Sequence, residues 1–371
     1  MAQAPIYLDN QATTPLAPEV FDAMIPWLRD NFGNPHSAHI LGRKASAAVE
    51  HARAQVLALL PDDGQLLFTG SATEAINTGF GILETLKFPS RNKIILLETE
   101  HAAVRDTAAA YEKKGFRVAY HPVKSDGIVS LEQLDRVIDE HTALVAAMLV
   151  NNEIGAVQPI EAIAALAHEK GALMLCDIVQ GYGRVSIPDN IDIAAISAHK
   201  IYGPKAIGAL WYRNGLSMPP MIHGGGQEQG LRSGTLSPAL CVGFGQAAEL
   251  CVHRSRKDTA HIQALYDKAS HCFSNWTING STDHRYCGNL NIMRTDIDVA
   301  RLMSEVRDVA FSAGSACASG SGRPSHVLAA LGLDRAQIRS SIRLGFGRYN
   351  SEDDIERAAN SINQAVEAQL G

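Results

Sequence analysis

Short apolar runs with strand character alternate with helical patterns along the first 210 residues, and this alternation most constrains the fold. Strand-like runs at residues 66–69, 143–150 and 173–176 are separated by stretches with helical spacing. The run at 143–150 is apolar almost throughout, as expected for a strand buried on both faces. This order of elements favours a mostly parallel sheet with helices on both faces, and therefore an α/β fold.

Polar residues stand directly after the strand-like runs. They are Thr69, His101, Asn152, Asp177 and Ser197. Ligands of open α/β sheets bind outside the carboxyl ends of the strands. We therefore expect these five side chains to meet at one active site.

Composition and charge narrow the class of protein. The chain has 371 residues, of which 46% are hydrophobic, and this length favours two lobes. The net charge of -6 gives no basic field for direct nucleic-acid binding. No apolar run approaches the roughly 20 residues of a membrane helix, and residues 1–7 lack a signal-peptide pattern. We expect a cytoplasmic protein without membrane contact.

The six cysteines do not form a metal or disulfide pattern. They are Cys176, Cys241, Cys251, Cys272, Cys287 and Cys317, and no two of them form a CxxC pair. We therefore expect no bound metal and no disulfide framework. Cys317 differs from the others because it lies in the small-residue run 312–322, which predicts a mobile loop. Cys176 lies inside an apolar run and is expected in the core.

Lys200 is the candidate nucleophile. It ends the sequence Ser197-Ala198-His199-Lys200, between strand-like runs at 191–196 and 207–212. A partly buried lysine beside another cation loses proton affinity and becomes a usable amine nucleophile. A surface lysine after a strand would show the same local pattern, so Lys200 alone leaves both interpretations open.

A candidate anion site follows the run at residues 66–69. Gly70-Ser71-Ala72-Thr73 leads from that strand into a helical pattern. Backbone N–H groups and the helix dipole at such a start bind anions. An ordinary capped helix start has much the same sequence, so the motif alone does not separate the two interpretations.

Nine stretches, in order between about residues 6 and 350, together resemble one enzyme family. They are Tyr7-Leu8-Asp9 with residues 12–15, residues 32–35, 69–74, 99–101, 151–155, 197–203, 232–235, Gly314-Ser315-Ala316-Cys317 and Ser341-Ile342-Arg343. The ordered set resembles the group I cysteine desulfurases, of the iron–sulfur and nitrogenase type, which are fold-type I enzymes dependent on pyridoxal 5'-phosphate (PLP). The resemblance implies a large, mostly parallel seven-stranded sheet domain at 15–254. It also implies a smaller α+β domain formed by 1–14 plus 255–371, which carries the cysteine loop.

The resemblance assigns the cofactor-binding residues. It implies that Lys200 carries the PLP aldehyde and that the phosphate is held by Ala72, Thr73, Ser197 and His199. Asp177 would contact the ring nitrogen, and Gln180 and Asn152 would contact the ring oxygen. His101 would stack on the ring and move protons. Thr235 would complete the phosphate site of the partner chain in a homodimer. Without the family, Asp177 would equally suit a strand-end cap.

The resemblance also assigns the reaction. Arg343 would bind the carboxylate of L-cysteine, with Asn152 helping to orient the substrate, and Cys317 would take the sulfur as a persulfide. L-alanine would leave, and the sulfur would pass to an acceptor protein for iron–sulfur cluster assembly or for nucleic-acid thiolation or phosphorothioation. Arg343 alone would also suit a surface ion pair. The alternatives are another fold-type I enzyme, such as a selenocysteine lyase or an aminotransferase, and a catalytically idle protein-binding partner.

Three departures from the family pattern concern the sulfur acceptor. Gly322-Arg323 replaces the usual Leu-Glu, Ala206 replaces a usual Gly, and the chain stops at Gly371 without the extended tail of the housekeeping members. A reversed charge near Cys317 alters the choice of partner. These departures lead us to expect a specialised desulfurase with a dedicated acceptor.

Overall fold

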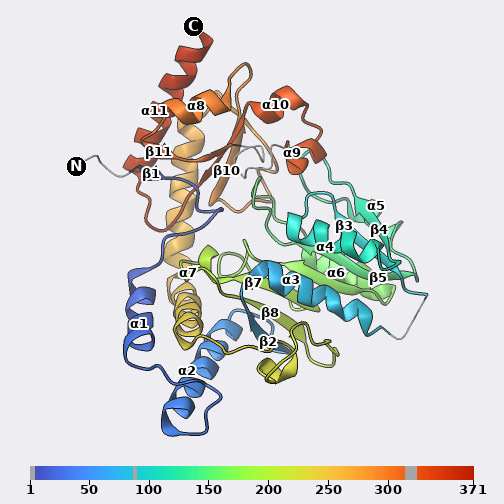
Figure 1. The fold of residues 1–371 in the computed structure, drawn as a ribbon. Coiled ribbons are helices and arrows are strands. Elements are labelled where there is room, and N and C mark those ends of the chain that lie inside the picture. The colour runs from blue at the N-terminus through green and yellow to red at the C-terminus, as the bar shows by residue number, and fades with distance from the viewer. Residues whose placement is uncertain (1–4, 87–89, 314–323) are drawn as a thin grey trace.

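The computed structural model describes residues 5–86, 90–313 and 324–371, and Figure 1 shows its arrangement. A seven-stranded sheet with helices on both faces makes up the larger part of the molecule. A four-stranded sheet with its own helices lies beyond one end of it, and a pair of two-residue strands completes the strands of the described part. The predicted α/β class and the large, mostly parallel sheet are confirmed.

The large sheet has the strand order β2-β8-β7-β6-β5-β3-β4. Its strands are β2 (Gly64–Thr69), β3 (Lys93–Leu97), β4 (Arg117–His121), β5 (Thr142–Met148), β6 (Leu173–Asp177), β7 (Ile193–Ser197) and β8 (Gly208–Arg213). The five strands from β7 to β4 are parallel, whereas β8 runs antiparallel to both of its neighbours. All seven residues of β5 are buried, as its apolar sequence predicted. Because β2 is reversed twice relative to β7, its carboxyl end lies at the same edge as those of the parallel strands.

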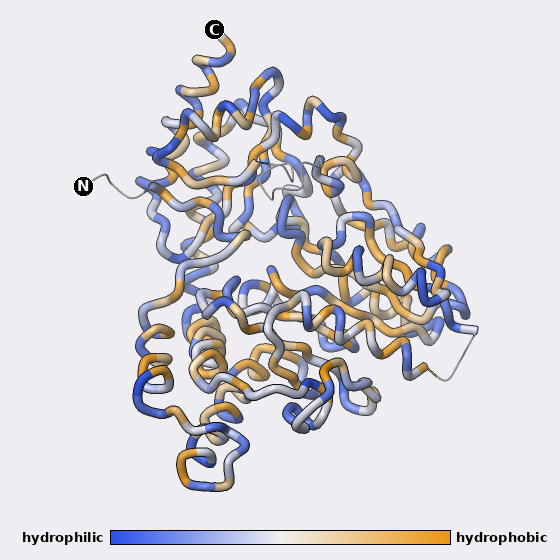
Figure 2. The backbone as a smooth tube through the Cα atoms, viewed as in Figure 1, coloured by the Kyte–Doolittle hydropathy of each residue, from blue (hydrophilic) through white to orange (hydrophobic). Residues whose placement is uncertain are grey.

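Alternate residues of the strands face two separate helical layers. Leu67, Ile94 and Leu96 pack in one apolar cluster with α3 (Ala72–Phe80) and α4 (Ala102–Glu112). Phe68 and Ile95 belong to the other cluster, with the helices α1 (Pro18–Arg29), α2 (Ile40–Leu57), α5 (Leu131–Asp135), α6 (Ile160–Glu169) and the first part of α7 (Pro238–Cys272). Successive side chains of a strand point to opposite faces of the sheet, and the strands of this sheet are apolar on both faces. Figure 2 shows hydrophobic residues along the strands of this sheet and also in the helices around it.

The smaller sheet has the order β12-β13-β10-β9 and is antiparallel throughout. Its strands are β9 (Thr277–Ile278), β10 (Asn289–Met293), β12 (Ser312–Ala313) and β13 (Ser341–Gly345). It packs on α8 (Val299–Glu305), α11 (Glu352–Leu370) and the second part of α7. The helices α9 (His326–Ala330) and α10 (Arg335–Arg339) precede β13, and β1 (Ile6–Tyr7) pairs in parallel with β11 (Val309–Ala310).

Helix α7 is one continuous helix from Pro238 to Cys272. Neither glycine nor proline interrupts residues 252–272, so no helix-breaking residue ends the helix within this stretch. The predicted domain border at residue 254 therefore falls inside α7, which extends along both sheets in Figure 1. The division into 15–254 and 1–14 plus 255–371 stays a prediction.

No helix in the described ranges is long and apolar enough to cross a membrane.

Candidate active site

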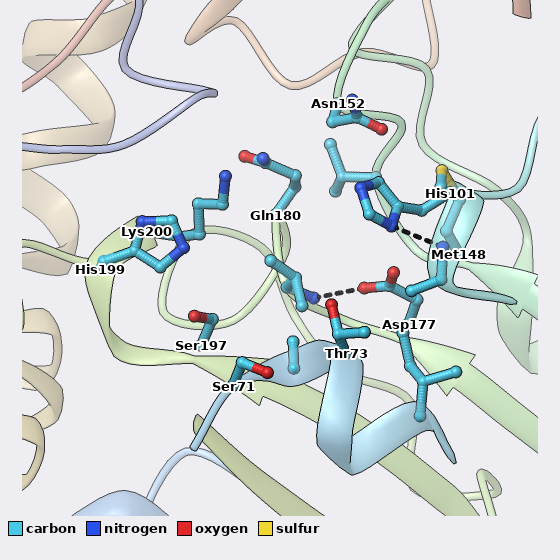
Figure 3. Close-up of a pocket in the computed structure, with 15 residues that line it drawn as sticks. Ser71, Thr73, His101, Met148, Asn152, Asp177, Gln180, Ser197, His199 and Lys200 are labelled. Carbon is cyan, nitrogen blue, oxygen red and sulfur yellow. Dashed lines mark hydrogen bonds between the residues drawn. The ribbon is translucent and has the colours of Figure 1, made fainter. Parts of the chain in front are cut away.

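A pocket opens where the carboxyl ends of β3, β5, β6 and β7 meet the amino end of α3. Nine polar or titratable residues and Ala72 are among those that line it: Ser71, Ala72, Thr73, His101, Asn152, Asp177, Gln180, Ser197, His199 and Lys200. Figure 3 shows Lys200 and Gln180 on one side of this pocket, with His101 and Asp177 on the other. The polar residues after the strands therefore do meet, with the exception of Thr69, whose hydroxyl donates to the Ser71 carbonyl oxygen at 2.8 Å.

The amino end of α3 forms one wall of the pocket. Ser71 caps this helix, since its hydroxyl accepts the Glu74 N–H at 3.2 Å. Gly208 at the start of β8 allows the close approach of this turn, because a Cβ there would lie 2.6 Å from the Ser71 carbonyl carbon. Backbone N–H groups at the start of a helix have no partner within the helix and favour an anion. The wall therefore has the properties of an anion site.

His199 and Ser197 extend this wall from β7. The Nδ1 atom of His199 lies 3.0 Å from the Thr13 hydroxyl. Burial, followed by the charges of Lys200, Lys205 and Arg184, lowers the pKa of His199 to about 4. The ring is therefore neutral near pH 7, and its Nε2 atom is the side that can donate to an anion when Nδ1 accepts from Thr13.

Lys200 is held by the amino-terminal turn of the chain. Its Nζ atom donates to the carbonyl oxygens of Gln11 and Ala12, both at 2.7 Å. Burial is the largest cause that lowers the pKa of Lys200 to about 8, and the positive charges of Arg184 and Arg343 act in the same direction. About a tenth of the amine is thus unprotonated at pH 7, far more than for an ordinary lysine, and the unprotonated amine is the form that acts as a nucleophile.

Asp177 and His101 form the opposite side. The Asp177 Oδ1 atom accepts the Val179 N–H at 2.9 Å, and the carboxyl group is buried. Burial raises the pKa of Asp177, and the charges of His101 and Lys200 oppose this effect. His101 caps α4, with its Nδ1 atom accepting the Ala103 N–H at 3.1 Å, so its Nε2 atom is free to donate.

Gln180 has both ends of its amide engaged. Its Nε2 atom donates to the Gln11 carbonyl oxygen at 2.9 Å, and its Oε1 atom accepts from Arg184 Nη1 at 2.8 Å. Asn152 lines the pocket with its side chain, while its carbonyl oxygen accepts from Arg343 Nη1 at 3.0 Å. Arg343 therefore lies behind Asn152, outside the pocket lining.

Arg343 on β13 already has a carboxylate partner. Its Nη2 atom lies 2.7 Å from Asp9 Oδ1 and donates to the Ser312 hydroxyl at 3.1 Å. Its Nε atom is buried and has no hydrogen-bond partner among the described residues. The predicted role in binding a substrate carboxylate stays a prediction, and it would require the carboxylate to use Nε or to share the guanidinium with Asp9.

Thr235, like Arg343, is absent from the described lining of this pocket. It is exposed on the loop before α7. Its predicted contact with a partner chain is not tested. Cys317 lies outside the described residues, so its predicted role is also untested.

Three contributors to the site escaped prediction. Gln11 acts through its backbone carbonyl, which carries no side-chain signature. Arg184 lies seven residues after Asp177 in a loop, outside every motif that we recognised. Glu100 lies in the recognised stretch 99–101, but no role was assigned to it. Its carboxyl group is fully buried, and its Oε1 atom accepts the Met148 N–H at 2.7 Å.

The donor set fits a flat ring that carries a cationic nitrogen, an aldehyde and a phosphate. Asp177 is buried, no ion pair among the described residues includes it, and burial raises its pKa. A ring N–H⁺ beside it would favour the charged form of this carboxyl group. The amine of Lys200 suits an aldehyde, and the amino end of α3 with Ser197 and His199 suits a phosphate. These are the groups of PLP.

The family model described as aminotransferase class-V matches residues 6–358. The chain belongs to this family. A cysteine desulfurase IscS from Rickettsia bellii (strain OSU 85-389) is 42% identical over 369 residues, covering 96% of this chain and 90% of the relative. The corresponding IscS of Rickettsia africae (strain ESF-5) is 41% identical over 98% of this chain and 91% of the relative. Within the family, the chain is thus a cysteine desulfurase.

Solved structures agree with this placement. A protein titled NifS-like has a TM-score of 0.91 and 33% identity, covering 98% of this chain and all (100%) of that one. A structure titled SspA in complex with cysteine has a TM-score of 0.82 and 35% identity, covering 93% of this chain and 99% of that one. DndA from Streptomyces lividans has a TM-score of 0.78 and 30% identity, covering 94% and 99%.

Proposed function

We propose that the protein uses PLP, held at Lys200, to convert L-cysteine to L-alanine. The sulfur is taken as a persulfide on Cys317 and passed to an acceptor protein. The observation that carries this proposal is the amine of Lys200, with its pKa lowered to about 8, placed across one pocket from buried Asp177. A related structure titled as a complex with cysteine supports the choice of substrate.

Bound PLP supplies an electron sink that stabilises a carbanion at the substrate Cα atom. Asp177 would keep that sink effective, because its carboxylate would hold the ring nitrogen in its protonated form. Ala72, Thr73, Ser197 and His199 would hold the phosphate, and Gln180 would donate from Nε2 to the ring oxygen.

Lys200 moves the proton. With substrate bound, its amine would take the Cα proton and return it elsewhere on the substrate. His101 can donate from Nε2 while its Nδ1 atom stays engaged with the Ala103 N–H. The two groups face each other across the pocket in Figure 3, which suits proton transfer on the substrate between them.

Cys317 takes the sulfur. Its thiolate attacks the sulfur atom of the substrate, so a sulfur–sulfur bond forms as the bond between Cβ and sulfur breaks. The electron pair of the broken bond stays with the substrate carbon, which is then protonated and becomes the methyl group of alanine. No external oxidant or reductant is needed until the persulfide is discharged. Arg343 binds the substrate carboxylate during this sequence.

The active unit is proposed to be a homodimer. Thr235 is exposed on a loop of its own chain, which leaves its hydroxyl accessible to the phosphate site of a second copy. Replacing Thr235 by alanine should weaken retention of PLP while leaving the dimer intact by sedimentation. Unchanged PLP retention would remove Thr235 from the phosphate site.

The test of the proposed function is a product assay. The purified protein is incubated with PLP, L-cysteine and a thiol reductant, and alanine and sulfide are measured. We expect equimolar alanine and sulfide, and we expect Cys317→Ser to release almost no sulfide although it still binds L-cysteine. Cys272→Ser is the matched control, because Cys272 lies on α7 outside the pocket lining, and it should behave as wild type. Wild-type sulfide release by Cys317→Ser would refute the role of Cys317.

The acceptor is tested separately. Protein carrying a ³⁵S-labelled persulfide is offered an iron–sulfur scaffold protein and, in parallel, the proteins encoded beside its own gene. Our proposal of a dedicated acceptor expects faster transfer to a neighbouring gene product. Faster transfer to the scaffold would contradict it.

A further inference from the structure

Arg184 lies directly behind the Lys200 side of the pocket. Its Nη2 atom donates to the carbonyl oxygen of Lys200, and its Nη1 atom donates to Gln180 Oε1 at 2.8 Å. The guanidinium also stacks over the ring of Tyr286, with 5.2 Å between its central carbon and the ring centroid. One side chain therefore contacts both residues that form this side of the pocket.

We propose that Arg184 is a positioning residue that holds the backbone of Lys200 and the amide of Gln180 in their working arrangement. The proposal rests on the proposed function, because it concerns the amine that would carry the cofactor. Arg184 does not line the pocket itself, so it acts through these two residues and not on the substrate.

The guanidinium group of Arg184, whose two terminal nitrogens donate as a fork, fixes which way the Gln180 amide points. An amide can be turned over to exchange its oxygen and nitrogen, and its partners decide the orientation. Arg184 can only donate, so it requires Oε1, which leaves Nε2 on the side of the Gln11 carbonyl oxygen. Because the same carbonyl oxygen accepts from Lys200 Nζ, Arg184, Gln180 and Lys200 form one connected network.

No carboxylate in the described part of the chain forms an ion pair with Arg184. Arg343 lies 2.7 Å from Asp9, and Arg348 lies 2.7 Å from Asp258. Among the ion pairs of the described residues, none includes Arg184, whose side-chain partners are two carbonyl oxygens, the Gln180 amide oxygen and an aromatic ring. An unpaired cation near an amine favours the neutral amine, and Arg184 is the largest charge contribution that lowers the pKa of Lys200.

Two substitutions separate the fork from the charge. Arg184→Lys keeps the charge and loses the fork, whereas Arg184→Gln loses the charge and keeps a hydrogen-bonding group. Arg254→Gln is the control, because it removes the same charge from α7 while its partner Asp258 keeps Arg348. Lys200 is labelled in the full-length protein without PLP by a trace amine-reactive reagent across pH 6–11, and the peptide is quantified by mass spectrometry.

We expect the labelling midpoint of Lys200 near pH 8 in wild type, Arg184→Lys and Arg254→Gln. In Arg184→Gln it should rise by about one unit, as expected for a single nearby charge. With PLP bound, both Arg184 variants should lower kcat for L-cysteine about 10-fold or more, with KM changed less than about 3-fold, because the fork is lost in both. Arg254→Gln should change neither quantity.

An unchanged Lys200 midpoint in Arg184→Gln would overturn the effect of charge, and wild-type kcat in Arg184→Lys would overturn the effect of the fork. A lower melting temperature with both quantities unchanged would show that Arg184 is only structural. The labelling needs neither cofactor nor turnover. A failure of Lys200 to bind PLP, which would refute the proposed function, is thus distinguishable from a failure of this inference.

Discussion

The two sides of the pocket bury groups of opposite charge. On one side, Lys200 is surrounded by carbonyl oxygens and by the cations Arg184 and Arg343, and its pKa falls to about 8. On the other side, Asp177 and Glu100 are buried carboxyl groups, and burial raises the pKa of both. Desolvation disfavours the charged form whatever its sign, so both sides are driven toward neutrality.

The two buried groups of opposite charge do not pair with each other. Lys200 and Asp177 face each other across the pocket without contact, and neither neutralises the other directly (Figure 3). A ligand that brings a cationic nitrogen to Asp177 and a carbonyl carbon to Lys200 satisfies both sides. The two sides are therefore complementary to the two ends of PLP, and the predictions below test each side in turn.

The largest expected effect is on the Lys200 side. Lys200→Ala should lower turnover of L-cysteine by about 10²–10⁴-fold, the range that a positioned proton-transfer group contributes. Steady-state alanine production measures it. Lys205→Ala is the matched control, because Lys205 is exposed and close in sequence, and it should retain wild-type turnover. Comparable losses in both variants would mean that Lys200 has no special role.

On the opposite side, the two buried carboxyl groups should differ. Asp177→Asn should lower kcat on the order of 10²–10³-fold, as loss of a preorganised electrostatic partner does. Glu100→Gln should change kcat little, because burial already favours its neutral form and the amide oxygen can still accept the Met148 N–H. Similar losses of kcat in the two variants would end the distinction between these carboxyl groups.

The buried carboxyl group of Glu100 should also make the stability of the folded protein depend on pH. Its folded-state pKa is raised, so the folded protein prefers the proton, and this stabilisation is complete below the ordinary pKa of glutamate. It is lost as the pH rises toward the folded-state value. Glu100→Gln should therefore match wild type in melting temperature near pH 4 and exceed it at pH 8. A variant that is less stable than wild type at pH 8 would contradict this account.

Arg343→Lys tests the substrate end of the same cation cluster. A lysine cannot reproduce the paired hydrogen bonds of a guanidinium, and the loss should be about 1.5–3 kcal/mol, or roughly 10- to 100-fold in affinity for L-cysteine. Titration of the purified variant with L-cysteine measures it. The Nη2 atom of Arg343 already donates to Asp9, so the substrate carboxylate would share the guanidinium group with Asp9. Unchanged affinity would place the substrate carboxylate elsewhere.

The smallest effect is expected at Ala206, outside the pocket lining. This residue replaces a glycine usual in the family and has a φ angle of 65° in the left-handed region. The sequence led us to connect it with the acceptor, whereas its described consequence is backbone strain before β8. Ala206→Gly should raise stability by about 1 kcal/mol, measured by urea unfolding, without changing kcat. A loss of stability would show that the turn is not strained.

The elements that could be predicted are those with a strong local pattern. The apolar runs of β5 and β6 indicated buried strands, and parallel topology then brought His101 and Asp177 to one edge. Strands β9, β11 and β12 have two residues each, too few to show a period of two. Their pairing depends on distant partners, so sequence alone could not reveal them.

Contacts between distant segments were not predicted for a related reason. Asp9 and Arg343 are 334 residues apart, and nothing local marks them as an ion pair. Gln11 contributes a backbone carbonyl, which every residue has, so its identity carries no signal. Arg184 acts on Lys200 only because the chain folds back after β6. Sequence reasoning thus predicted side chains that do meet in one pocket but missed most of the residues that contact them.

Reduction with borohydride tests the central claim most directly. The purified protein is loaded with PLP, treated with borohydride, digested, and its peptides are mapped by mass spectrometry. The account predicts one reduced PLP adduct, on Lys200, with its formation weakened in Asp177→Asn. An adduct on any other lysine, or no adduct in protein that produces alanine from L-cysteine, would contradict it.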